Sequence, residues 1–163
     1  MGTTRGAGPT SPGAAGESQL VLFQLAGKSF AVDLAQVEQI IEYREPARTP
    51  RRPASVEGVV EHRGRYLALV NLRTRLNVAE PGPSNPAILL LKGIGSDPLV
   101  GVLVDQVLRV LSIPEGGILT PPPRVFGIRA EYIRGVANAG GRPLVWLDIP
   151  KILTTTEPIT LLA

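Results

Sequence analysis

The chain contains one sequence pattern twice, and this repeat constrains its fold more than any other feature. The first occurrence, residues 56–76, reads VEGVVEHRGRYLALVNLRTRL, and the second, residues 134–153, reads RGVANAGGRPLVWLDIPKIL. The aligned pairs are Gly58 and Gly135, Val59 and Val136, Gly64 and Gly141, Arg65 and Arg142, Leu67 and Leu144, Asn71 and Asp148, and Leu76 and Leu153. Upstream of these, residues 30–41 resemble residues 100–111. Two matches in the same order predict two copies of one β-rich unit of about 70 residues.

The repeated pattern is typical of a β-hairpin followed by a short helical turn. Runs rich in Val and Leu flank Arg63, Gly64 and Arg65, and a glycine at such a turn adopts φ > 0 without strain. We expect roughly ten strands in an all-β fold, a pair of small five-stranded β-barrels with short helical turns. The two subdomains are expected at about residues 19–83 and 84–153, with the joint at the Pro- and Gly-rich residues 77–85.

The composition of the chain ends predicts short tails on both sides of the repeated units. Residues 1–18 carry almost no large apolar side chains, so we expect a disordered N-terminal tail. Residues 154–163 are expected to form a short C-terminal tail. We expect neither a spanning helix nor a signal peptide, because no run of about 18 apolar residues and no apolar signal core is present.

The residues needed for catalysis or metal binding do not form a recognisable pattern. The chain has no cysteine and a single histidine, His62, and its carboxylates do not cluster in the sequence. A metal site, a thiol nucleophile and a Walker A loop are therefore not expected. A lone histidine beside a turn usually lies on the surface. The sequence predicts a binding module with no cofactor, not an enzyme.

The repeat also separates residues of the shared fold from residues with another purpose. Arg63 aligns with Gly140, and the preceding Glu61 and His62 align with Asn138 and Ala139, so these polar residues occur in one copy only. Residues 44–75 hold eight arginines and three glutamates. A basic face fits nucleic acid, a membrane surface or an acidic protein, and also an ordinary solvated surface.

Five segments in order resemble the CheW family. They are FxLxGxxFAVxxxxVxxII, then PxxVxGVVxxRGR, the NLR that follows the strand, VGVLVDxVxxVL, and YIxGVxxxxGRPLVWLDIPKIL, and they span about residues 19–153. The resemblance implies two SH3-like five-stranded barrels around a mainly hydrophobic groove. It also implies a cytoplasmic chemotaxis adaptor at receptor arrays on the inner face of the membrane. Such adaptors link the cytoplasmic tips of methyl-accepting chemoreceptors to the regulatory domain of a CheA-type histidine kinase and form rings with other CheW-like domains.

The resemblance also implies particular partner-binding residues. Arg63 matches the arginine of the family's N-L-R-G segment, where kinase control is sensitive. Gln39 and Ile40 fall in the segment associated with the kinase. The positions associated with receptor contact are Val37, Gly58 and Gly101, although shared counterparts give Val37 and Gly58 a structural explanation as well.

Three departures from the family pattern lie near Arg63. Glu61 and His62 replace the usual Asn-Leu, Ala68 replaces a frequent proline, and Asn71 replaces a frequent aspartate. They leave the identity of the partners open. The alternative hypothesis is a nucleic-acid-binding SH3-like module with an arginine-rich face. The low aromatic content, 4%, argues against base stacking, so we do not expect nucleic acid as a partner.

Overall fold

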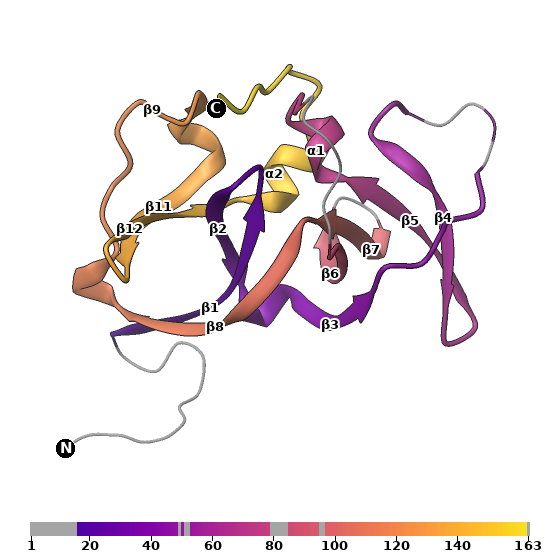
Figure 1. Ribbon diagram of the computed structural model, residues 1–163, viewed down its shortest axis with the longest axis horizontal. Helices are drawn as coiled ribbons and strands as arrows, with labels where there is room; N and C mark the ends of the chain where they lie inside the picture. Colours follow the sequence, from indigo (N-terminus) through magenta and orange to yellow (C-terminus); the bar gives the residue numbers. More distant parts are fainter. Residues whose placement is uncertain (1–15, 49, 51–52, 79–84, 95–96, 163) are drawn as a thin grey trace.

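The fold consists of two five-stranded β-sheets packed against each other. A computed structural model describes residues 16–48, 50, 53–78, 85–94 and 97–162 of the chain (Figure 1). The sheet that we call the middle sheet has the strand order β3-β6-β7-β5-β4, and the sheet that we call the terminal sheet has the order β11-β12-β2-β1-β8. A two-stranded β10-β9 ribbon lies beside them. The prediction of a mostly β fold with two five-stranded units is confirmed.

The elements occur along the chain in the following order. The strands of the middle sheet are β3 (Val37–Glu42), β4 (Val56–His62), β5 (Arg65–Asn71), β6 (Ala87–Ile94) and β7 (Asp97–Val104). Those of the terminal sheet are β1 (Glu17–Leu25), β2 (Lys28–Asp33), β8 (Gln106–Pro114), β11 (Ile133–Ala139) and β12 (Arg142–Leu147). The remaining elements are β9 (Arg124–Val125), β10 (Ile128–Arg129), the α-helices α1 (Leu72–Arg75) and α2 (Ile149–Thr154), and the 3-10 turns η1 (Leu34–Gln36), η2 (Glu115–Gly117) and η3 (Ala130–Tyr132).

The two copies of the repeat exchange strands. The β1–β2 hairpin pairs through β1 with β8 and through β2, in parallel, with β12. The β6–β7 hairpin pairs through β6 with β3 and through β7, in parallel, with β5. Each sheet thus combines a hairpin from one copy with three strands from the other. The expected division near residue 83 is therefore not a boundary between sheets, because non-local pairing, and not chain order, sets the composition of each sheet.

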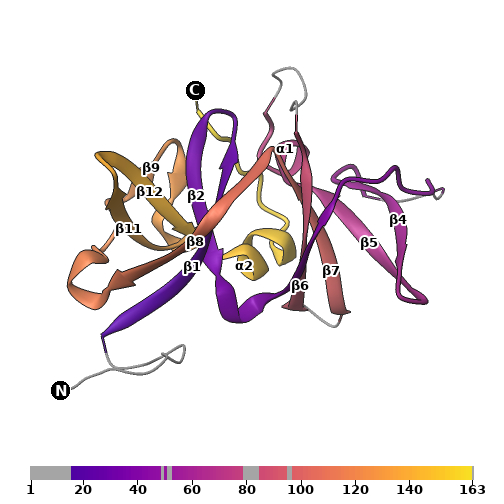
Figure 2. The same ribbon diagram turned by 60° about the horizontal axis from the view of Figure 1, so that its bottom comes forward.

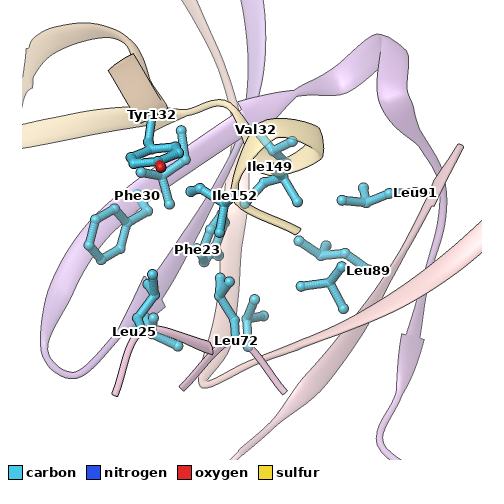
Figure 3. Packing of buried hydrophobic residues seen from close by; sticks show 14 of the residues in the cluster. Phe23, Leu25, Phe30, Val32, Leu72, Leu89, Leu91, Tyr132, Ile149 and Ile152 are labelled. Carbon is cyan, nitrogen blue, oxygen red and sulfur yellow. The ribbon is translucent and has the colours of Figure 1, made fainter. Parts of the chain in front are cut away.

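The central strands of each sheet are buried on both faces, which explains the uninterrupted apolar runs in β1 and β6. Phe23 and Leu25 point into the central core between the sheets, together with Leu89 and Leu91 (Figure 3), and Val21 belongs to the same cluster. The alternate residues of each strand pack on the opposite face. On that face of the terminal sheet lies a cluster that contains Leu20 and Leu22. On that face of the middle sheet lies another cluster, which contains Ile88 and Leu90.

Among the described residues, neither sheet closes into a barrel through a continuous ladder of hydrogen bonds. The segment after β3 crosses to the opposite edge and meets β4 at one isolated bridge, Ala47 with Val59. The segment after β8 meets β11 in the same way, Leu119 with Val136. Val59 and Val136 are equivalent in the repeat, so the partial closure is a shared feature of the two copies. The two expected five-stranded units are present, and within the described residues their barrels are not closed.

Both chain ends take a larger part in the fold than we expected. Glu17 and Ser18 belong to β1, where they pair with Pro114 and Ile113, while residues 1–15 lie outside the described residues. Residues 155–162, which we call the C-terminal strap, pack across the molecule after α2. Its Ile159 and Leu161 are buried in the central core. These apolar side chains have a groove to fill, so the segment is not a free tail.

The helical turns largely follow the repeat. Asn71 caps α1 by accepting hydrogen bonds from the backbone N–H groups of Arg73 and Thr74, and Asp148 caps α2 by accepting from Lys151. Asn71 and Asp148, which are aligned in the repeat, therefore both act as helix N-caps. The 3-10 turn η1 has no counterpart in the second copy, where β8 begins at Gln106 and Asp105 forms an ion pair with Arg73.

Candidate protein-binding surface

Arg63 lies exposed at the tip of the β4–β5 hairpin of the middle sheet. Its backbone is left-handed, with φ 52°, and Gly64 follows with φ 79°. The Gly64 N–H donates to Glu61 Oε2 at 2.6 Å, which stabilises the turn. Among the described residues, no hydrogen bond or ion pair engages the Arg63 side chain. The turn thus presents an unpaired arginine side chain to solvent.

His62 joins this hairpin to the opposite edge of the middle sheet. Its Nε2 lies 3.1 Å from Oε1 of Gln39 on β3, so the ring nitrogen donates when it carries the proton. The histidine is 7% exposed, and the expectation of a surface histidine was wrong. Since β3 and β4 are opposite edges of one sheet, this contact holds the sheet in its curved form. His62 occurs in only one copy of the repeat, which was the signal for a special role.

Two arginines flank the same contact. Arg65 Nη2 lies 3.3 Å from Glu38 Oε2 on β3, and both side chains are about half exposed. Arg44 Nη1 donates to the backbone oxygen of Glu61 at 2.6 Å. Gln39 and Arg63 therefore lie on one part of the molecule, which we call the hairpin-end surface. The structure brings together these two of the six predicted site residues, whereas Ile40, the next residue on β3, points to the opposite face of the sheet.

A second feature is an exposed apolar margin, which we define as Ile40 on β3 with Leu108 and Val110 on β8. Their exposed fractions are 41%, 40% and 49%. Ile40 pairs with Leu89, and Val110 pairs with Val21, and these partners both belong to the central core. Directly opposed residues share a face of a sheet, so Ile40 and Val110 extend the inter-sheet face at its edges. β3 and β8 both run along the lower side of Figure 1, which comes forward in Figure 2.

The remaining predicted site residues lie in less accessible positions. Gly101 is buried, and a Cβ there would lie 3.2 Å from Ile88 Cγ2 and 3.3 Å from Leu69 Cδ1. Gly58 is also buried, and a Cβ there would lie 2.3 Å from the carbonyl oxygen of Ala47. Val37 is half-buried and packs against the central core. A role for these three residues in receptor contact stays a prediction, and for the two glycines it would act through the backbone.

The described residues contain no constellation suited to metal chemistry. No three His, Cys, Asp or Glu side chains within the described ranges lie close enough to hold a metal ion. Within the same ranges, no helix has both the length and the apolar character needed to cross a bilayer. The notable features of the molecule are therefore its surfaces.

Comparison with known proteins shows a consistent relationship. Residues 19–157 match the model of the CheW-like domain. The chain is 30% identical over 143 residues to a chemotaxis protein CheW of Treponema pallidum, an alignment that covers 85% of this chain and 84% of that protein. It is 32% identical over 138 residues to a chemotaxis protein CheW of Thermotoga maritima, covering 84% and 88%. The FrzA protein of Myxococcus xanthus is 29% identical over 143 residues, covering 86% and 88%.

The fold agrees with a solved structure as well. The scaffolding protein TtCheW of Thermoanaerobacter tengcongensis superposes with a TM-score of 0.78 at 21% identity, over 94% of this chain and 96% of that one. The family match covers most of the chain. This chain belongs to the CheW-like family, the non-enzymatic scaffold proteins of chemotaxis signal transduction that couple receptors to the kinase CheA.

Proposed function

We propose that the hairpin-end surface binds the regulatory domain of a CheA-type histidine kinase. The observation that carries this proposal is the exposed, unpaired Arg63, on a hairpin that the contact between His62 and Gln39 holds against β3. A left-handed turn favours glycine, asparagine or aspartate, so the turn itself does not require an arginine at residue 63, and recognition is the better explanation for it. A guanidinium binds carboxylate groups well, which suits an acidic patch on the kinase.

The apolar margin is the surface that we propose for the receptor. Ile40, Leu108 and Val110 leave apolar area in water at the edges of the inter-sheet face, beside Val37. The cytoplasmic tip of a methyl-accepting chemoreceptor would cover this area. Simultaneous binding of both partners places the protein in receptor arrays at the inner face of the membrane, where contacts with other CheW-like domains would form a ring.

The test is Arg63→Glu, with Arg142→Glu as the matched control. Arg142 is an exposed residue of the equivalent hairpin in the terminal sheet. Both substitutions are expected to change the free energy of unfolding by no more than about 0.5 kcal/mol. Arg63→Glu is expected to weaken kinase binding about tenfold or more, measured by isothermal titration against the regulatory domain, and to lower receptor-dependent kinase activity. Equal effects of the two substitutions would contradict the assignment of Arg63.

The contacts of the arginines weaken the nucleic-acid alternative. Arg65 pairs with Glu38, Arg73 pairs with Asp105, and Arg75 donates to backbone carbonyl oxygens. These three side chains are engaged within the molecule, whereas phosphate binding requires free cations. Arg51 and Arg52 lie outside the described residues. RNA binding that persists at moderate salt would support this alternative.

A further inference from the structure

The C-terminal strap lies in a channel between the end of α1 and the turn of the β9–β10 ribbon. Ile159 and Leu161 are 3% and 7% exposed, while Thr160 and Leu162 between and after them are exposed. This alternation is typical of an extended segment that inserts every second side chain into a core. Figure 1 shows the strap in yellow, running from the region of α1 toward β9.

The channel holds the strap mainly through its backbone. The Leu161 N–H donates to the carbonyl oxygen of Leu76 at 2.9 Å, and the Leu162 N–H donates to that of Phe126 at 2.8 Å. From the channel, Asn77 Nδ2 donates to the carbonyl oxygen of Ile159 at 3.1 Å. This combination of backbone bonds and alternating apolar anchors is the way in which proteins bind extended peptides.

Side chains of the channel add contacts at the beginning of the strap. Arg75 Nη2 donates to the carbonyl oxygens of Thr155 and Glu157, each at 3.0 Å. The Tyr132 hydroxyl donates to Glu157 Oε1 at 2.5 Å. The channel therefore favours an acidic residue followed, two and four positions later, by apolar side chains.

The channel and the strap fit each other closely at Gly127. Gly127 has φ +85°, and a Cβ there would lie 2.6 Å from Leu162 Cγ and 2.8 Å from the carbonyl oxygen of Thr160. Two pockets lie beside the strap, one of about 340 Å³ next to Thr156 and Glu157 and one of about 180 Å³ next to Ile159 and Thr160. The match to the CheW-like domain ends at residue 157, so both apolar anchors lie beyond the matched part.

We propose that this channel is a peptide-binding groove that accepts the C-terminal strap of a second copy of the chain in place of its own. The strap follows the last helix, so its withdrawal breaks no strand pairing and no helix. Exchange forms the same contacts between two copies, and it becomes favourable where a high protein concentration offsets the proximity of the chain's own strap. This inference does not depend on the surfaces proposed above for the kinase and the receptor.

The groove is tested with the full chain and a fluorescent peptide of residues 157–162, EPITLL. The double variant Ile159→Ala with Leu161→Ala weakens the chain's own strap and is expected to bind the peptide at least tenfold more tightly than the unaltered chain. Adding Gly127→Val is expected to abolish this binding. Val21→Ala, which removes a buried side chain of β1 from the same core, controls for general loss of stability. No peptide binding by the double variant, with its β-sheet circular dichroism retained, would overturn the groove.

Exchange between copies is tested by disulfide formation, since the chain has no cysteine of its own. Asn77 Nδ2 and Thr160 Oγ1 lie 3.4 Å apart. We therefore mix full chains carrying Asn77→Cys with size-tagged full chains carrying Thr160→Cys under mild oxidation. Exchange predicts several-fold more mixed dimer than the control pair of Asn77→Cys with Lys92→Cys, whose second position is exposed on β6. A yield equal to that of the control pair would overturn the exchange.

Discussion

At the scale of single residues, the repeated glycines have a steric purpose. A Cβ on Gly58 would collide with the carbonyl oxygen of Ala47, and a Cβ on Gly135 would lie 2.4 Å from Ile118 Cγ2. At both positions the segment that crosses between the sheet edges passes directly over the glycine. The sequence alignment of the two copies thus reflects the same backbone crossing in each sheet.

The space around each glycine predicts the effects of three alanine substitutions. Gly58→Ala is expected to cost about 2–4 kcal/mol of unfolding free energy, since the obstructing atom belongs to the backbone and must move. Gly101→Ala is expected to cost less, because side chains surround it and its counterpart in the other copy is already Ala31. Gly116→Ala, with open space around it, is the control and is expected to change stability little. Denaturant unfolding measures all three, and a similar cost at Gly58 and Gly116 would contradict the steric explanation.

At the scale of secondary-structure elements, a largely buried ion pair joins the two sheets. Arg73 of α1 donates through Nε and Nη2 to the two carboxylate oxygens of Asp105, both at 2.7 Å. Asp105 Oδ2 also accepts a hydrogen bond from the Ala26 N–H at the β1–β2 turn. The carboxylate therefore connects α1, which follows β5 of the middle sheet, to the β1–β2 hairpin of the terminal sheet.

Removing this carboxylate is expected to affect stability much more than removing an exposed one. The side chains of Arg73 and Asp105 are 12% and 14% exposed, compared with 52% and 44% for Arg65 and Glu38. Asp105→Ala is expected to cost about 3–5 kcal/mol, because it takes both oxygens away from a guanidinium with little access to water. Glu38→Ala is expected to cost at most about 1 kcal/mol. Urea unfolding of the two variants decides this, and equal costs would contradict the role of burial.

The contact between η3 and the C-terminal strap predicts a pH dependence. The hydrogen bond from the Tyr132 hydroxyl to Glu157 raises the pKa of Tyr132 above its usual value of 10.0. The folded state therefore binds this proton more tightly than the unfolded state, and the resulting stability is complete below about pH 10. The stability is lost as the pH rises through the raised pKa of the folded state.

The measurement is the difference in unfolding free energy between the unaltered chain and Tyr132→Phe. This difference is expected to be constant at neutral pH and to shrink on going above about pH 10. The exposed Tyr66 provides the control, because Tyr66→Phe is expected to leave the pH dependence unchanged. A difference that grows with alkaline pH would contradict the assigned direction of the pKa shift.

At the scale of the whole molecule, each copy of the repeat depends on the other. The two large sheets contain eight strand pairings in the described chain, and four of them, β1 with β8, β2 with β12, β3 with β6 and β5 with β7, join the two copies. The pairings within a copy are only hairpins. An isolated two-stranded hairpin is at best marginally stable in water.

We therefore expect that chains of residues 1–83 and 84–163 do not fold separately but assemble when mixed. Each fragment alone is expected to lack cooperative thermal unfolding. An equimolar mixture is expected to regain it and to elute as a complex of one fragment with the other. Circular dichroism and size-exclusion chromatography measure both outcomes. Cooperative unfolding of either fragment alone would show that a copy is an independent domain.

Much of this protein was predictable from the sequence, because strands and turns depend on local patterns. Runs rich in Val and Leu identify the strands of the hairpins, and the glycine turns mark their ends. The repeat further separated Arg63 and His62 from the residues of the shared fold. The family followed from five motifs in order. Each of these features is encoded within a short segment or in the order of segments.

The tertiary structure alone decided which strands pair, how His62 is buried and where residues 155–162 lie. An apolar pattern specifies which face of a strand is buried, but it does not specify the neighbouring strand. With two similar copies, pairing within a copy and pairing between copies satisfy the same pattern. The exchange of hairpins between the sheets, the contact of His62 with Gln39 and the channel of the C-terminal strap all depend on packing between residues distant in the sequence.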